Sequence, residues 1–148
     1  MMKATGIVRR IDDLGRIVIP KEIRRTLHIR ESDPLEIFTD REGQVILKKY
    51  SPIGEMTTFA KQYAESLAQV SGHATLIADR DQFIAVSGGC KQLLNKAVSR
   101  QLEEKVNNRE TVIAAKGDRN YVNIAEDIAV DYAWQLITPI ICEGDIIG

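Results

Sequence analysis

The chain has 148 residues, and its 20 Lys and Arg nearly balance its 21 Asp and Glu, which leaves a formal net charge of −1. Its hydrophobic content of 44% is typical of a globular protein. It contains no run of about eighteen apolar residues, which excludes a membrane-spanning helix, and its first residues lack the apolar stretch of a signal peptide. We therefore expect a protein that stays in the cytoplasm.

The neutral average conceals two parts of opposite charge. Residues 1–50 carry eleven basic and eight acidic side chains, whereas residues 51–148 carry nine basic and thirteen acidic ones. The first thirty residues alone hold eight Lys or Arg against three acids. This division predicts two domains with different partners, and a compact basic surface favours an anionic partner such as duplex DNA.

The first expected elements are two short strands and one short helix. Residues 5–11 and 16–19 place β-branched side chains among arginines, which predicts strands, and the Asp-Asp-Leu-Gly sequence between them predicts a turn. Pro20 favours the first position of a helix over residues 20–27. Ile23 and Leu27 lie four residues apart and are expected to form its buried side.

The same helix is expected to carry a basic face. Lys21, Arg24 and Arg25 follow the spacing i, i+3, i+4, which places them together on the side opposite the apolar stripe. Repulsion among these cations would be relieved by a bound anion, and a merely solvated helix face is the alternative. Arg9 and Arg16 on the preceding strands favour the anion.

A hairpin and a linker complete the first part of the chain. Residues 35–39 and 44–48 are predicted strands, joined by a loop that ends at Gly43. Four short strands and one helix bury little apolar surface, so we expect dimerisation through shared strands. Pro52 and Gly54 then interrupt the pattern, which predicts a linker over residues 51–54.

Residues 55–148 are expected to form an α+β domain. The apolar spacing predicts an amphipathic helix over 55–70 and a second helix over 97–107. Strands are expected over 73–78, 83–87, 111–114 and 134–141. A further strand begins after a turn at 143–145, so we expect this domain to be incomplete at its C-terminus.

The pattern of reactive side chains predicts no enzyme. His28 and His73 lie in no catalytic or metal-binding motif. Cys90 and Cys142 are too far apart for a metal-ligand spacing, and we expect free thiols. Cys90 follows two glycines and is the one candidate for a reactive thiol, although inert packing is the commoner role. We predict no catalytic residue, no metal site and no cofactor.

The N-terminal part resembles the AbrB family of bacterial transition-state regulators. The resemblance lies in residues 5–27, TGIVRRIDDLGRIVIPKEIRRTL, and continues through DPLEI at 33–37 and VILKKY at 45–50. It covers essentially all of residues 3–50. The longer chain, with SPI at 51–53 and VSG at 86–88, is similar to the sporulation regulators of this family, which carry a GAF-type domain.

This resemblance implies a fold and a binding site. Residues 1–50 would form a swapped-hairpin β-barrel built by two chains, residues 51–54 a linker, and residues 55–148 a GAF-like domain. The family's DNA-contacting arginines correspond to Arg9, Arg16, Arg24 and Arg25. Supporting cations would be Lys3, Arg10 and Lys21.

The resemblance also implies a function, which is sequence-selective DNA binding by a repressor or activator of sporulation or transition-state genes. Such a protein would be associated with the nucleoid. It would be a homodimer through residues 1–50 and a tetramer through the GAF-like domain, with a preference for A·T-rich sites read through DNA shape. Two alternatives are the antitoxin of a toxin–antitoxin pair and a regulator that senses a small molecule through the GAF-like domain.

Overall fold

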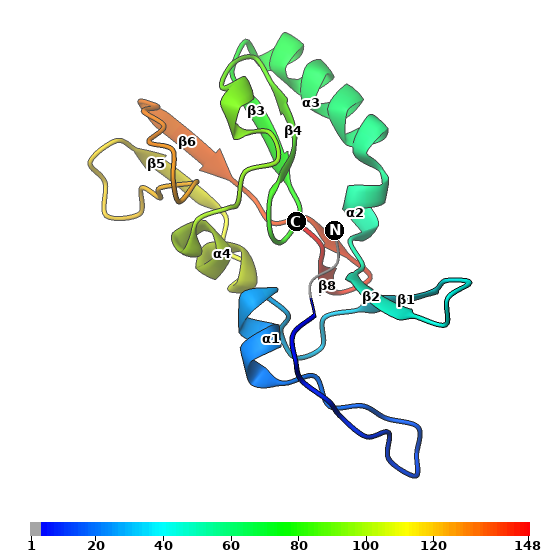
Figure 1. The fold of residues 1–148 in the computed structure, drawn as a ribbon. Helices are drawn as coiled ribbons and strands as arrows, with labels where there is room; N and C mark the ends of the chain where they lie inside the picture. The colour runs from blue at the N-terminus through cyan, green and yellow to red at the C-terminus, as the bar shows by residue number, and fades with distance from the viewer. Residues whose placement is uncertain (1–3) are drawn as a thin grey trace. The chain divides into compact units, whose positions relative to one another are not determined.

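The computed structural model describes residues 4–148. It divides into two compact units, Met1–Tyr50 and Ser51–Gly148, here called unit 1 and unit 2. Among residues 4–50, unit 1 has one helix and one β-hairpin, whereas unit 2 alternates helices with pairs of antiparallel strands (Figure 1). Within residues 4–148, no helix combines the length and the apolar character needed to cross a membrane.

The N-terminal arm, residues 4–20, forms no helix or strand, which differs from the strands expected over 5–11 and 16–19. A strand requires a neighbour that pairs with its backbone N–H and C=O groups, and the arm has no such neighbour within residues 4–50. The turn expected between the two segments is present. The Asp12 amide donates to the Arg16 carbonyl oxygen at 3.0 Å, and Gly15 takes a left-handed φ of 74°.

The short basic helix of unit 1 is present as α1, Lys21–Thr26. Pro20 precedes its first residue, where a missing N–H has no cost. Ile23 is half-buried, but Leu27 lies beyond the last helical residue and is 55% exposed. The expected buried side is therefore reduced to Ile23, because a helix of this length ends before its second apolar position.

The hairpin expected in unit 1 is also present. Strands β1 (Leu35–Thr39) and β2 (Val45–Lys49) are antiparallel, with Leu35 opposite Lys49. The Asp40 carboxylate accepts hydrogen bonds from the amides of Glu42 and Gln44 at 3.0 and 2.8 Å, which closes the connecting turn.

Unit 2 begins with two helices, α2 (Pro52–Glu55) and α3 (Thr57–Ser71). The residues expected as a linker therefore lie largely within a helical turn, which begins where the Ser51 hydroxyl accepts from the Gly54 amide. Helix α3 packs on β3 (Thr75–Ala78) and β4 (Phe83–Ser87). The buried residues of α3 are all small, namely Ala60, Ala64 and Ala68.

The second half of unit 2 surrounds a small apolar core. A short 3₁₀ turn, η1 (Lys91–Leu93), leads to α4 (Arg100–Asn107). Helix α4 starts three residues later than expected because Ser99 caps it, its hydroxyl accepting from the Leu102 amide at 3.0 Å. The core comprises Phe83, Leu93, Leu102, Val122 and Ala125.

The last strands of unit 2 differ from those expected at 111–114, which is shifted by one residue, and at 134–141, which is divided. Strand β5 (Val112–Ala115) pairs with β6 (Trp134–Ile137), and β7 (Ile141–Cys142) pairs with β8 (Asp145–Ile146). The single strand expected over 134–141 is divided at Pro139, which cannot donate to a ladder. The described residues of unit 2 thus show an α+β arrangement of separate two-stranded sheets.

Candidate nucleic-acid interface

The cations predicted to bind DNA lie in unit 1, and all that the structure describes are exposed. Arg9 and Arg10 are in the N-terminal arm, and Arg16 follows its turn. Lys21, Arg24 and Arg25 lie on α1. Lys3 lies outside the described residues. Within residues 4–148, Arg16 is the one of these six cations that forms an ion pair.

Asp12 organises the arm around Arg16. One carboxylate oxygen accepts from the amides of Leu14 and Arg16 at 3.0 and 2.8 Å, and the other accepts from the Arg16 Nε at 2.9 Å. These hydrogen bonds, led by that of the Arg16 amide, hold the pKa of Asp12 below its ordinary value of 3.8. The Arg16 guanidinium remains exposed, so it is orientated and still accessible to a ligand.

Helix α1 ends in a Schellman motif that carries two of the arginines. The Ile29 amide donates to the Arg24 carbonyl oxygen at 2.7 Å, and the His28 amide donates to that of Arg25 at 3.3 Å. His28 occupies the left-handed position with a φ of 52°, where glycine is usual. Arg24 and Arg25 lie in the last turn, where the helix dipole stabilises cations. The favourable interaction with the helix dipole stabilises both arginines at these positions even when no anion is bound.

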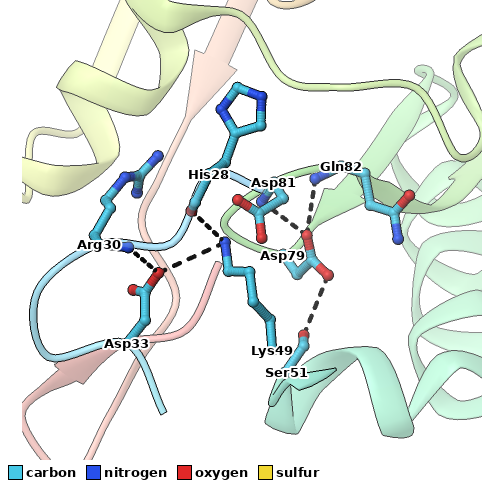
Figure 2. A network of polar contacts seen from close by, with 8 residues as sticks. All are labelled: His28, Arg30, Asp33, Lys49, Ser51, Asp79, Asp81 and Gln82. Carbon is cyan, nitrogen blue, oxygen red and sulfur yellow. Dashed lines mark hydrogen bonds and ion pairs between the residues drawn. The ribbon is translucent and has the colours of Figure 1, made fainter. Parts of the chain in front are cut away.

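A cluster of polar contacts joins the end of α1 to the hairpin, and sequence reasoning missed it (Figure 2). The Lys49 ammonium donates to the His28 carbonyl oxygen at 2.9 Å and lies 3.6 Å from the Asp33 carboxylate. The same carboxylate oxygen accepts from the Arg30 amide at 2.8 Å. Two features of the sequence could have indicated this contact, namely an Asp directly before Pro34 and a Lys at the end of an apolar strand.

The polar groups singled out in unit 2 have structural roles. Asp79 accepts from the amides of Asp81 and Gln82, each at 2.8 Å, and from the Ser51 hydroxyl at 3.1 Å (Figure 2). It therefore closes the turn between β3 and β4. Residues 4–148 contain no group of three His, Cys, Asp or Glu arranged to hold a metal ion.

Cys90 is half-buried in a left-handed backbone conformation ahead of η1. Its neighbour is the Tyr132 phenol, whose pKa is raised chiefly by burial and further by the adjacent thiol. Cys90 packs against the apolar core of unit 2, so its site fits packing better than reactivity.

Comparison with known proteins decides the family. Residues 55–148 match the family described as stage V sporulation protein T C-terminal, transcription factor. Over the whole chain, 57% of residues are identical to stage V sporulation protein T (SpoVT) of Bacillus subtilis, across 99% of this chain and 82% of the relative. The chain belongs to the SpoVT family of transcription factors. Its regulatory role in sporulation or transition-state control follows from this membership.

Other relatives of this SpoVT-family chain share its N-terminal part. Residues 8–55 match a family described as antidote-toxin recognition MazE, bacterial antitoxin. The transition state regulatory protein AbrB of Bacillus subtilis is 43% identical over 73% of this chain and 93% of its own length. A DNA-bound structure of the N-terminal domain of AbrB is 63% identical over 34% of this chain and 91% of that chain, with a TM-score of 0.29. The two matching family descriptions name a transcription factor and an antitoxin, and neither is an enzyme family.

Proposed function

We propose that this SpoVT-family regulator binds duplex DNA through the exposed cations of unit 1. The observation that carries the proposal is their accessibility: six predicted DNA-binding cations lie in one unit with exposed side chains, on an orientated turn and a capped helix. The principal contacts are Arg9, Arg16, Arg24 and Arg25. Arg10, Lys21 and Lys3 support them.

The chemistry of arginine suits both parts of this task. Its planar guanidinium binds a phosphate, or the O6 and N7 atoms of guanine, through two parallel hydrogen bonds. Phosphate contacts fix the position of the protein on the duplex, and base contacts and DNA shape provide selectivity. Selective binding of this kind suits a repressor or activator of sporulation or transition-state genes.

We further propose that residues 1–50 act as a homodimer with swapped hairpins. Among residues 4–50, Pro20 is the one buried residue, so unit 1 has almost no core of its own. Its arm exposes apolar side chains on both sides of the turn, with Val8 at 86% and Val18 at 73% exposure. Strands of a second copy would cover these side chains and pair with the arm's backbone.

Residues 55–148 are proposed as a GAF-like assembly domain that joins two such dimers. Helix α3 buries three alanines, and the side of the helix next to them exposes large apolar side chains from the N-cap onward, which are Met56, Phe59, Tyr63, Leu67 and Val70. Neighbours in this set are three or four residues apart, as on the contact faces of helices that pack against other helices. Linking two dimers raises the effective concentration of the DNA-binding units.

Two alternative functions have different support. A small-molecule sensor has one favourable observation, an open cavity of about 200 Å³ lined by polar groups that include Gln101, Lys105 and Arg119. A metabolite that raises the melting temperature of the full chain would favour it. An antitoxin is disfavoured, because the disordered toxin-binding tail expected of one is replaced here by the folded unit 2.

The DNA-binding proposal is tested by Arg24→Ala combined with Arg25→Ala. If all eight principal arginines of a dimer contact phosphates, a plot of log affinity against log salt concentration has a slope of about −7. The double variant removes four of them, so the slope should be about −3.5. We expect its affinity for an A·T-rich duplex to fall at least about hundredfold at low salt. Fluorescence anisotropy across a salt series measures both quantities.

The matched control removes two exposed cations of unit 2, Lys61→Ala with Arg100→Ala. Both are paired with acids along their own helices, to Glu65 and Glu104. This control should leave affinity and salt slope unchanged. Binding by the arginine variant equal to that of the wild type would show that α1 has only a solvated basic face.

A further inference from the structure

The segment that follows α1 is held at both of its ends by one side chain. Residues 28–33 leave the helix through the left-handed His28 and contain a second left-handed residue, Ser32, with a φ of 67°. The Lys49 ammonium donates to the carbonyl oxygen of His28 at the start and lies against the carboxylate of Asp33 at the end (Figure 2). The two ends of the loop thus depend on a common cation.

This cation is itself fixed by the hairpin. Lys49 is the last residue of β2 and pairs with Leu35, the first residue of β1. The Tyr50 amide donates to the Pro34 carbonyl oxygen at 3.0 Å, which extends the pairing beyond the strands. The ammonium therefore connects the hairpin to the loop that follows α1.

Burial makes the connection hard to replace by water. The Asp33 side chain is 4% exposed and that of Lys49 is 24% exposed. A carboxylate at this depth requires charged or hydrogen-bonding partners, and removal of the ammonium would take away one of them. The Asp33 carboxylate also accepts from the Arg30 amide, so a change at Lys49 extends into the loop backbone.

We propose that Lys49 is a positioning residue for DNA binding, because it fixes α1 and its arginines relative to the hairpin. The inference depends on the DNA-binding function proposed above. The mechanical path is short: Lys49 holds His28, and His28 and Ile29 donate to the carbonyl oxygens of Arg25 and Arg24. The helix bearing the predicted contacts is thereby set in one orientation on the hairpin.

The test compares Lys49→Met with Lys48→Met in the full chain. Lys48 is the adjacent cation of β2, exposed and 5.4 Å from the centre of the Phe38 ring, so its variant removes the same charge without touching the loop. Affinity for a fluorescent A·T-rich duplex is measured across a salt series. Lys49→Met should bind at least about tenfold more weakly than Lys48→Met, with the wild-type salt slope. Lys49→Arg, which retains a cation, should restore most of the affinity.

The salt slope separates positioning from direct phosphate binding. If Lys49 itself binds a phosphate, its replacement lowers the slope by about 0.9 for each protomer, whereas a displaced helix weakens binding without that signature. A reduced slope for Lys49→Met would make Lys49 a DNA-contacting residue and overturn the proposal. Wild-type affinity in a folded Lys49→Met protein would overturn it as well.

A second variant covers the case in which Lys49→Met does not fold. Asp33→Asn keeps an oxygen that can accept from the Arg30 amide and removes the negative charge that faces Lys49. Weaker binding at an unchanged slope in this variant supports positioning, and failure of both variants to fold would assign the Lys49–Asp33 pair to stability alone. The wild type serves as a separate check, because absence of salt-dependent duplex binding there would refute the proposed function whatever Lys49 does.

Discussion

At the residue scale, two polar side chains fix parts of the basic surface of unit 1 through hydrogen bonds. Asp12 gathers three hydrogen-bond donors from two residues and orientates Arg16, and Lys49 connects the end of α1 to the hairpin. A guanidinium orientated before binding loses less conformational freedom when it meets a phosphate. The basic composition of this part of the chain therefore becomes a surface with a defined geometry.

The Asp12 turn should respond to acid in a specific direction. The hydrogen bonds hold the pKa of Asp12 in the folded protein below its ordinary value of 3.8. Their full contribution to stability is therefore present above pH 3.8, and it is lost as the pH falls through the lower pKa of the folded state. We expect the NMR shift of the Arg16 amide to titrate with a midpoint below 3.8. Asp12→Asn should abolish this titration. A midpoint at or above 3.8 would show that the turn does not stabilise the carboxylate.

At the element scale, α3 shows how one helix can divide two tasks between its sides. Its alanine side allows a close approach to β3 and β4, and the adjoining side keeps large apolar groups exposed. Gly88 at the end of β4 belongs to the same close approach, since an added Cβ would lie 2.9 Å from the His73 carbonyl oxygen and 3.2 Å from the Ala68 Cβ. Small residues here set the distance between the layers.

Enlarging the alanine side should therefore destabilise unit 2. Ala64 has no exposed surface, and Ala64→Leu should lower the free energy of unfolding by about 1–3 kcal/mol. Urea unfolding followed through Trp134, the only tryptophan of the chain, measures this in unit 2. The matched variant Glu65→Leu on the exposed side should change stability by less than about 0.5 kcal/mol. Equal effects of the two variants would contradict the assigned packing.

At the scale of the whole molecule, the two units expose apolar surfaces of different kinds. Unit 1 lacks a core and exposes the apolar side chains of its arm, whereas unit 2 has a core and exposes one side of a helix. Completion of unit 1 by a second copy and pairing of unit 2 through α3 would be independent contacts. Together the two proposed contacts would generate a tetramer from two dimers.

Sedimentation velocity should separate the two contacts. Val8→Asp with Val18→Asp places charges on the arm, so we expect dimers held through unit 2 that no longer bind duplex DNA. Tyr63→Glu with Leu67→Glu places charges on α3, so we expect dimers held through unit 1 that still bind. If either pair leaves the mass of the assembly unchanged, the corresponding contact is not an interface.

Local sequence patterns predicted the helix and the hairpin of unit 1. Pro20 fixed the start of α1, alternation and a turn glycine fixed the β1–β2 hairpin, and the resemblance in residues 5–50 predicted a DNA-binding regulator, which the family confirms. These features depend on neighbours within a few residues, which is why they can be recognised in the sequence. The proposed contact residues remain a prediction.

Only the tertiary structure decided the features that depend on distant partners. The arm is not a strand within unit 1, because a ladder requires a neighbour that residues 4–50 do not provide. Helix α4 begins at Arg100 because the Ser99 side chain caps it there, although the apolar periodicity starts earlier. The last long strand is divided at Pro139, because proline has no backbone N–H to donate to a strand ladder. The Lys49 contact joins residues 21 positions apart, and no local pattern records such a distance.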